Sequence, residues 1–577
     1  MKAMMSLCAG VSAALMIGLA ASAADTDKTP APWWKGAVIY EIYPRSFQDS
    51  DGDGVGDLNG ITTRLDHIKS LGVDAIWLTP IYPSPLVDFG YDISDYTAID
   101  PQYGTLADFD RLVAEARKRN IRVIMDLVLN HTSDKHPWFV ESASSRNNPR
   151  RDWYVWRDGR DKDVPPNNWQ AVFGHSGWKY DAKTGQWYWH KFYPEQPDLN
   201  WRNPKVAKAM YGVERFWIRR GVAGFRLDAI TTLFEDPKLR DEREVKDAAG
   251  KPIINAFGDP RLDDTRTNNL PEVHDILRQV RKVADEASNK EAVLIGETYV
   301  ADISDLKKMY GVGNDELQMP MDLQVGFINK LDVARFRKLL TDAQTGLGGN
   351  EPLLVLDNHD NPRWDRYGDG IHNEDIGRVL SAVILGSRGA AMYYYGDEIG
   401  MVTTPPARKE DVRDPIGIIG WPREKGRDGE RTPMQWTNGA NAGFSLPGTK
   451  TWLPISASAN AVNVAAQNGK ADSLLTWYRR LGELRKSNPA LRAGDQIMLN
   501  TDDPHVLAWL RYTAKGEAVL FACNFTAAAQ TVRFDLQALH VSANNAVALL
   551  NSPGQDEPPS LTSITLKPFG VVALSLH

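Results

Sequence analysis

Carboxylates, imidazoles and one guanidinium follow directly after four short apolar runs of this sequence. The four segments read DLVLNH, GFRLDAI, GET and DNHD, and their polar residues include Asp126, Asn130, His131, Arg226, Asp228, Glu297, His359 and Asp360. Because chemistry collects at the carboxyl ends of the strands in a parallel barrel, we expect these side chains to form one site. A deprotonated and a protonated carboxyl group in one cleft are what glycoside hydrolysis requires.

The neighbours of two acids predict their protonation. Arg226 and Asp228 are two positions apart, so on a strand they point the same way, and the positive charge should keep Asp228 ionised as a nucleophile. Glu297 follows the apolar run AVLIG, and burial there should raise its pKa so that it holds a proton near neutral pH. A lone acid is more often a structural ion pair, but carboxylates at four strand ends together favour catalysis.

The elements that would position these groups alternate between apolar runs and amphipathic helices. Apolar runs typical of parallel strands buried on both faces cover residues 37–43, 73–78, 121–129, 222–227, 292–296, 353–356 and 390–395, with a weaker one at 317–319. Helices are predicted around residues 109–116, after a capping box formed by Thr105 and Asp108, and at 202–220, 271–287, 333–340 and 473–486. Eight strands alternating with helices predict an α/β fold, a (β/α)8 TIM barrel. A doubly wound open sheet is the alternative, but no G-x-G-x-x-G follows the first run.

Irregular and antiparallel segments add to this barrel. Residues 130–200 are polar and rich in Trp, which predicts a subdomain inserted after strand 3, and residues 401–463 form a second insertion. Alternating strands at 505–512, 517–523, 530–534 and 563–576 predict an antiparallel β-sandwich domain over residues 491–577. The barrel would then comprise residues 33–129 and 201–490.

The first 23 residues have the pattern of a secretory signal peptide: Lys2, an apolar stretch over residues 11–20 and an A-S-A exit at 21–23. A retained membrane anchor is the alternative, but the stretch is shorter than the roughly 20 residues that cross a bilayer. Removal of this segment would leave Cys523 as the only cysteine, which excludes an internal disulfide. We therefore expect a bacterial periplasmic or secreted protein without membrane association. The net charge of −7 disfavours nucleic acid as a partner.

An acidic segment, DSDGDGVGD, occupies residues 49–57. Asp49, Asp51, Asp53 and Asp57 are spaced as at the start of an EF-hand loop, in which side chains converge on one hard cation. The twelfth position is Gly60 instead of the bidentate Glu, so the segment is not an EF-hand. A solvated acidic turn is the alternative to a metal site.

Taken together, these motifs closely resemble the α-amylase-type family of glycoside hydrolases. The four strand-end segments match its main signatures in order. QPDLN (residues 196–200) is similar to the marker of its oligo-1,6-glucosidase branch, and GRDGERTPMQW (residues 426–436) is similar to a segment of its α-glucosidases and sucrose-active members. The resemblance implies a structural Ca²⁺ or Mg²⁺ held by Asp49, Asp51, Asp53, Asp57 and the Val55 carbonyl, and no organic cofactor.

The resemblance also implies a role for each site residue. Asp228 would be the nucleophile, Glu297 the general acid/base and Asp360 the transition-state stabiliser. The substrate-binding residues would be Asp88, Tyr91, His131, Phe173, Phe192, Arg226, His359 and Arg427. Tyr91 would stack under the sugar, and Asp88 with Arg427 would close the pocket around its non-reducing end. Phe173 and Phe192 would form a hydrophobic wall, with core packing as the alternative.

The implied activity is that of an exo-acting retaining α-glucosidase on short α-glucosides, with water or a second sugar as acceptor. Ala229 follows the nucleophile where members restricted to α-1,6 bonds usually carry valine, which favours α-1,4 substrates unless Ala229 merely packs. A sucrose hydrolase or isomerase and an oligo-1,6-glucosidase are the alternatives. A non-catalytic transporter accessory chain is disfavoured because all three catalytic carboxylates are present. The oligomeric state cannot be read from the sequence.

Overall fold

Eight parallel strands close into a barrel in the computed structural model, which describes residues 31–577 except 162, 535, 537–542, 544 and 557–562. In chain order the barrel strands are β1 (Val38–Ile42), β2 (Ala75–Leu78), β3 (Arg122–Val128), β7 (Gly224–Asp228), β8 (Val293–Gly296), β9 (Met319–Asp322), β10 (Leu353–Val355) and β11 (Ala390–Tyr394). The predicted TIM barrel is confirmed, and the weak run at 317–319 leads into β9. The predicted signal peptide lies outside the described residues.

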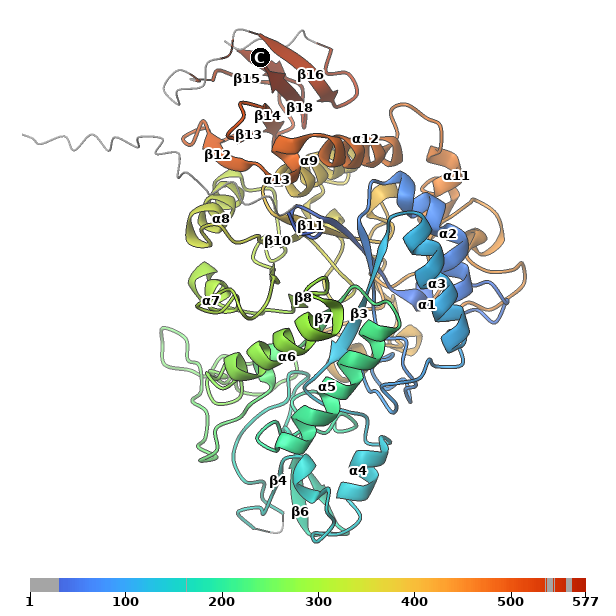
Figure 1. The fold of residues 1–577 in the computed structure, drawn as a ribbon, viewed down its shortest axis with the longest axis vertical. Coiled ribbons are helices and arrows are strands. Elements are labelled where there is room, and N and C mark those ends of the chain that lie inside the picture. Colours follow the sequence, from blue (N-terminus) through green and yellow to red (C-terminus); the bar gives the residue numbers. More distant parts are fainter. Residues whose placement is uncertain (1–30, 162, 535, 537–542, 544, 557–562) are drawn as a thin grey trace, which may run out of the picture.

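Helices surround this barrel (Figure 1). The longer ones are α2 (Leu58–Ser70), α3 (Leu106–Lys118), α5 (Pro204–Arg219), α6 (Val273–Ser288), α8 (Val333–Gly346), α9 (Asn373–Gly386) and α12 (Leu474–Ser487). The shorter ones are α1 (Pro44–Phe47), α4 (Pro137–Ser142), α7 (Ile303–Lys308), α10 (Pro415–Gly420), α11 (Val464–Gln467) and α13 (Pro489–Ala493). Helix α3 begins at the predicted capping box, in which the Thr105 amide donates to the Asp108 carboxylate at 2.8 Å. Among the described residues, no helix combines the length and apolarity that a membrane crossing requires.

The connection from β3 to β7 carries a small antiparallel sheet. Its strands are β4 (Trp156–Arg157), β5 (Trp178–Asp181) and β6 (Gln186–Trp189), in the order β4-β6-β5. Trp169, Trp178 and Trp189 pack into a buried cluster there, so the many tryptophans of this segment build its core. The unit lies at one end of the molecule, opposite the C-terminal strands (Figure 1).

The C-terminal region is antiparallel, as predicted. One sheet has the order β12-β13-β14-β18-β16 and a second pairs β15 with β17; the bounds are β12 (Asp495–Leu499), β13 (Val506–Tyr512), β14 (Ala518–Asn524), β15 (Gln530–Val532), β16 (Ala546–Asn551), β17 (Ile564–Leu566) and β18 (Val571–Leu576). An apolar cluster joins the two sheets through residues such as Leu510, Val532 and Leu574.

The single strand predicted over residues 563–576 is wrong. The chain turns after β17 and enters the other sheet as β18, because Pro568 lacks an amide proton and Phe569 has a left-handed backbone with φ of 48°. Strands β12 and β16 were not predicted.

Candidate active site

Arg226 is the centre of a buried cluster of three carboxylates at the carboxyl ends of β3, β7 and β8. The register of the barrel pairs Asp126 on β3 with Arg226 on β7. Nη1 of Arg226 donates to Asp126 Oδ1 at 2.9 Å and to Asp228 Oδ1 at 2.5 Å, and Nη2 lies 2.5 Å from Glu297 Oε1. Because one positive charge cannot balance three negative ones away from water, the cluster retains a proton near neutral pH.

Burial determines the protonation of the two predicted catalytic acids. It raises the pKa of Glu297 to about 7 in spite of Arg226, which is the predicted direction. Burial also raises the pKa of Asp228, against the opposing charge of Arg226. The expectation that Arg226 alone keeps Asp228 ionised is therefore wrong, because three acids share this one guanidinium. Burial therefore raises the pKa of both Asp228 and Glu297 above that of an ordinary carboxyl group.

The backbone amide of the residue directly after Asp228 contacts Glu297. Ala229 has a left-handed conformation with φ of 46° and ψ of 36°, which costs about 1–2 kcal/mol for a residue with a β-carbon. Its amide donates to Glu297 Oε2 at 2.8 Å, so this turn holds the predicted general acid beside the predicted nucleophile. A β-branched residue would adopt such a backbone less readily than alanine.

Asp360 has a different environment, rich in positive charge. Its Oδ1 accepts from Arg427 Nη1 at 2.9 Å and from Arg431 Nη2 at 2.8 Å, and its Oδ2 lies 3.2 Å from His359 Nε2. Burial acts to raise the pKa of Asp360, but His359, Arg427 and Arg431 together hold it well below its usual range. Asp360 is therefore an ionised carboxylate near neutral pH.

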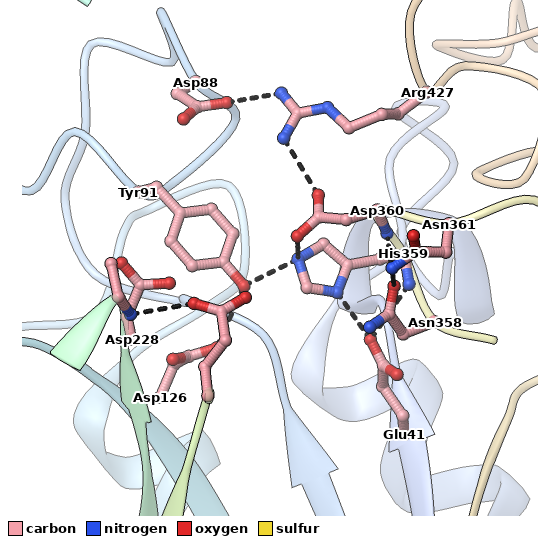
Figure 2. Close-up of polar contacts among 12 residues, drawn as sticks. Glu41, Asp88, Tyr91, Asp126, Asp228, Asn358, His359, Asp360, Asn361 and Arg427 are labelled. Carbon is pink, nitrogen blue, oxygen red and sulfur yellow. Dashed lines mark hydrogen bonds and ion pairs between the residues drawn. The ribbon is translucent and has the colours of Figure 1, made fainter. Parts of the chain in front are cut away.

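Tyr91 and His359 lie face to face between these acids. Their rings are 5.5 Å apart and nearly parallel, and the Tyr91 hydroxyl bonds both His359 Nε2 at 2.8 Å and Asp126 Oδ2 at 3.0 Å (Figure 2). The pair thus links Asp360 to the cluster around Arg226. The predicted sugar-facing residues on β3, β7 and the loop after β10 are brought to one place.

One side of the site is bounded by an ion pair between distant loops. Arg427 Nη2 lies 2.8 Å from Asp88 Oδ1, and the same guanidinium is held by Asp414. Gln196, the first residue of QPDLN, is fully buried and donates to Asp88 Oδ2 at 3.2 Å while also contacting His131 Nε2 at 3.0 Å. The sequence analysis identified this glutamine as part of a motif but predicted no contact for it. Gln196 therefore joins Asp88 and His131, two of the predicted substrate-binding residues.

Phe173 and Phe192 are half-buried and lie at this site. Their rings are 5.7 Å apart; the Phe192 ring lies 5.2 Å from that of His131, and the Arg427 guanidinium lies 5.6 Å from that of Phe173. Burial lowers the pKa of His131 to about 3, so its imidazole is neutral. The role of the two rings as a hydrophobic wall for the substrate stays a prediction.

The sequence analysis did not identify one exposed pair of aromatic residues. Tyr299, two residues after Glu297, and Phe327, after β9, stack with ring centroids 5.9 Å apart and are 41 % and 50 % exposed. Tyr299 is within electrostatic range of Glu297 and Asp360. The position of Tyr299 next to the acid was an available signal, whereas nothing local marks Phe327.

The acidic loop before α2 gathers three of its four carboxylates. Oxygens of Asp49, Asp51 and Asp57 lie within 4.8 Å of one another, a donor set that suits a hard divalent cation. Asp53 is outside this group, and its carboxylate accepts the Val55 amide at 2.8 Å. The assignment of Asp53 and of the Val55 carbonyl as ligands stays a prediction.

Comparisons with known proteins place this geometry in a family. The α-amylase catalytic domain matches residues 41–494. A probable α-glucosidase of Rhizobium meliloti is 44 % identical over 81 % of this chain and 85 % of its own length. The oligo-1,6-glucosidase of Parageobacillus thermoglucosidasius is 37 % identical over 93 % of this chain and 98 % of its own.

Solved structures agree with both the fold and the family. The α-glucosyl transfer enzyme XgtA superposes with a TM-score of 0.85 at 39 % identity, over 95 % of this chain and all of that one. An isomaltulose synthase variant of Erwinia rhapontici in complex with sucrose has the same TM-score at 33 % identity and the same coverage. The chain therefore belongs to the α-amylase family and is a glycoside hydrolase.

Proposed function

We propose that this protein is an exo-acting, retaining α-glucosidase that releases α-glucose from the non-reducing end of short α-glucosides. One observation carries the proposal: the Arg427–Asp88 ion pair covers the side of the site that lies beyond Asp360. A pocket closed on that side admits a chain end and excludes the middle of a polysaccharide. A starch-cleaving endo-enzyme would need an open cleft there.

The proposed mechanism places the proton of this buried cluster on Glu297, whose pKa burial raises to about 7. With that proton on Glu297, ionised Asp228 attacks the anomeric carbon while Glu297 protonates the departing oxygen, which gives a β-glucosyl-enzyme. Glu297 then takes a proton from the attacking acceptor hydroxyl, so the product keeps the α configuration. Asp360, which stays ionised, stabilises the positive charge that develops on the sugar.

Ala229 supports a preference for α-1,4 bonds. Its side chain is a single methyl group directly beside the nucleophile, and its amide contacts the general acid. Little bulk therefore intrudes where the leaving group of the substrate must lie. Gln196 and its motif favour an oligo-1,6-glucosidase as the second candidate function. The likeness to XgtA and to the isomaltulose synthase supports a third, the transfer of glucose to a sugar.

The exposed Tyr299–Phe327 pair supports transfer of glucose to a second sugar. Aromatic faces with apolar and polar surface suit stacking on sugar rings, and these two rings lie on the Glu297 side, where a leaving group departs and an acceptor arrives. An acceptor sugar held there would compete with water for the glucosyl-enzyme.

We also propose that the loop with Asp49, Asp51 and Asp57 binds a structural Ca²⁺ or Mg²⁺. Bringing three carboxylates together without a counter-ion is unfavourable, and the Asp49 carboxylate already accepts the amides of Gly52 and Gly54 at 2.6 and 2.8 Å. The loop leads into α2, whose first turn Asp57 caps. The ion would therefore stabilise the fold and take no part in bond cleavage.

Proton NMR of the products from maltose, isomaltose and sucrose tests the proposed function. We expect glucose from the non-reducing end, with maltose cleaved faster than isomaltose, and glucosyl-transfer products at high sugar concentration. Faster cleavage of isomaltose would favour the oligo-1,6-glucosidase alternative. Conversion of sucrose to an isomer without net hydrolysis would favour an isomerase.

A further inference from the structure

Glu41 is a buried glutamate beneath the sugar site that has no part in the mechanism above. It lies on β1, is fully buried, and its Oε1 is 2.6 Å from His359 Nδ1 and 3.3 Å from the His359 amide (Figure 2). Within the described part of the chain, its Oε2 has no hydrogen-bond partner. A buried carboxyl group with one oxygen that has no hydrogen-bond partner destabilises the fold. Its contact with His359, a predicted substrate-binding residue, therefore suggests that Glu41 has a functional role.

The hydrogen bonds around His359 indicate which ring nitrogen carries the proton. The Tyr91 hydroxyl donates to Asp126 Oδ2, so its oxygen accepts from His359 Nε2. The other neighbour of Nε2 is an oxygen of ionised Asp360. Because both neighbours are acceptors, Nε2 carries the proton, and in a neutral imidazole Nδ1 then has none. The hydrogen in the short contact to Nδ1 must therefore come from Glu41.

The surroundings support a neutral pair. Burial raises the pKa of Glu41 well above its ordinary value and lowers that of His359 well below its own. The arginines near His359 oppose a further positive charge there, and the acids near Glu41 oppose a further negative one. The charged and titratable groups that face the pair are Tyr43, Tyr91, Asp126, Arg226, Asp360, Tyr394, Arg427 and Arg431.

We propose that Glu41 is a positioning residue: as a neutral acid it donates its proton to Nδ1 of His359 and so fixes the tautomer whose Nε2–H faces Asp360 and the bound sugar. The hydrogen bond also holds the plane of the imidazole, against which the rings of Tyr91 and Tyr43 stack at 5.5 and 6.0 Å. The role of the Nε2–H toward sugar hydroxyls rests on the proposed function, whereas the tautomer itself does not.

Two variants and a matched control test this assignment. Glu41→Gln keeps a neutral donor, because its amide N–H can take the place of the acid O–H, and Glu41→Leu removes the donor at similar volume. Glu398→Gln is the control: Glu398 is equally buried, and its Oε1 lies 2.9 Å from His67 Nε2 and accepts from the Tyr40 hydroxyl at 2.9 Å. It removes a buried carboxylate–histidine contact without touching the sugar site.

The first readout is nitrogen-15 NMR of the full-length protein labelled on histidine, with the His359 signal assigned by its loss in His359→Gln. We expect the Nε2-protonated neutral tautomer in the wild type and in Glu41→Gln, and a mixture of tautomers in Glu41→Leu. An imidazolium or an Nδ1-protonated ring in the wild type would overturn the proposal. This spectrum requires no turnover and is decisive even if Glu41→Leu does not fold.

The second readout is kinetic. We expect kcat/KM on maltose to stay within about threefold for Glu41→Gln and Glu398→Gln, and to fall about tenfold for a folded Glu41→Leu, as the loss of one buried hydrogen bond predicts. Wild-type kinetics in Glu41→Leu would overturn the proposal. A wild-type enzyme that cleaves no α-glucoside would instead contradict the proposed function and leave the NMR result standing.

Discussion

Arg427 and Asp88 are 339 residues apart in the chain, yet their side chains meet over the active site with Nη2 2.8 Å from Oδ1 (Figure 2). The same guanidinium bonds Asp360 at 2.9 Å. Arg427 therefore both pairs with Asp88 and helps to keep Asp360 ionised. Under the proposed function, recognition of a chain end and stabilisation of the developing charge both depend on this arginine.

Removal of Asp88 tests the closure of the pocket. In Asp88→Ala we expect kcat/KM on maltose to fall about 10- to 100-fold, mostly through KM, because a charge-assisted contact to the sugar end is lost while Arg427 still bonds Asp360. Steady-state kinetics measure this, with Asp411→Ala as the control; Asp411 lies in the insertion that carries Arg427, and its side chain is 38 % exposed. An unchanged KM would show that Asp88 does not bind the sugar.

The pH dependence tests the role of Glu297. Its pKa of about 7 lies above that of an ordinary glutamate, so the protonated acid is present below that pH and is lost as the pH rises. We expect kcat/KM to fall on an alkaline limb near pH 7. Glu297→Gln should lose activity on maltose but still form the glucosyl-enzyme from α-glucosyl fluoride, whose leaving group needs no proton. Equal losses on both substrates would argue against an acid role.

Chelation tests the metal loop. We expect EDTA to lower the Tm by several degrees and added Ca²⁺ or Mg²⁺ to restore it, because an ion bound only by the folded state stabilises it by mass action. Initial rates well below the Tm should hardly change. Asp49→Asn should remove the response to EDTA. A Tm that is indifferent to chelator and to both cations would rule out the site.

Glu214 provides a test of burial away from the active site. It lies on α5, is 1 % exposed, and neither of its oxygens has a hydrogen-bond partner among the described residues. Burial raises its pKa well above the ordinary value of 4.5, so the folded state loses stability as the pH rises above 4.5, by up to about 1.4 kcal/mol per pH unit. Glu214→Gln should therefore raise the Tm at pH 8 and have little effect at pH 4.5.

The control for this prediction is Glu483→Gln, which changes an exposed glutamate on α12. Its effect on the Tm should be small and nearly the same at both pH values. A gain in Glu214→Gln that does not grow with pH would contradict the protonated state of Glu214.

The alternation of apolar runs and helices was sufficient to predict the barrel, because parallel strands buried on both faces leave a clear pattern. The strand ends that carry Asp228, Glu297 and Asp360 were identifiable for the same reason. The break between β17 and β18 was not, although Pro568 marks it, because both halves of the segment have a strand-like composition.

Contacts between residues that are distant in the chain could not be predicted from the sequence. The sharing of Arg226 by Asp126, Asp228 and Glu297 depends on the register between β3, β7 and β8, and this sharing overturned the expected ionisation of Asp228. In the sequence, Glu41 is one residue of a predicted buried strand. Its contact with His359 exists only because the closed barrel brings the two residues together. Local pattern identifies the catalytic groups, and barrel closure determines their protonation.

The anomeric form of newly released glucose tests the central claim that Asp228 attacks the sugar while Glu297 supplies the proton. Proton NMR within the first minutes of maltose cleavage, before mutarotation, distinguishes the two anomers. The account predicts that the glucose from the non-reducing end appears first as the α anomer, and that Asp228→Ala releases none. Initial release of β-glucose, or full turnover by Asp228→Ala, would contradict it.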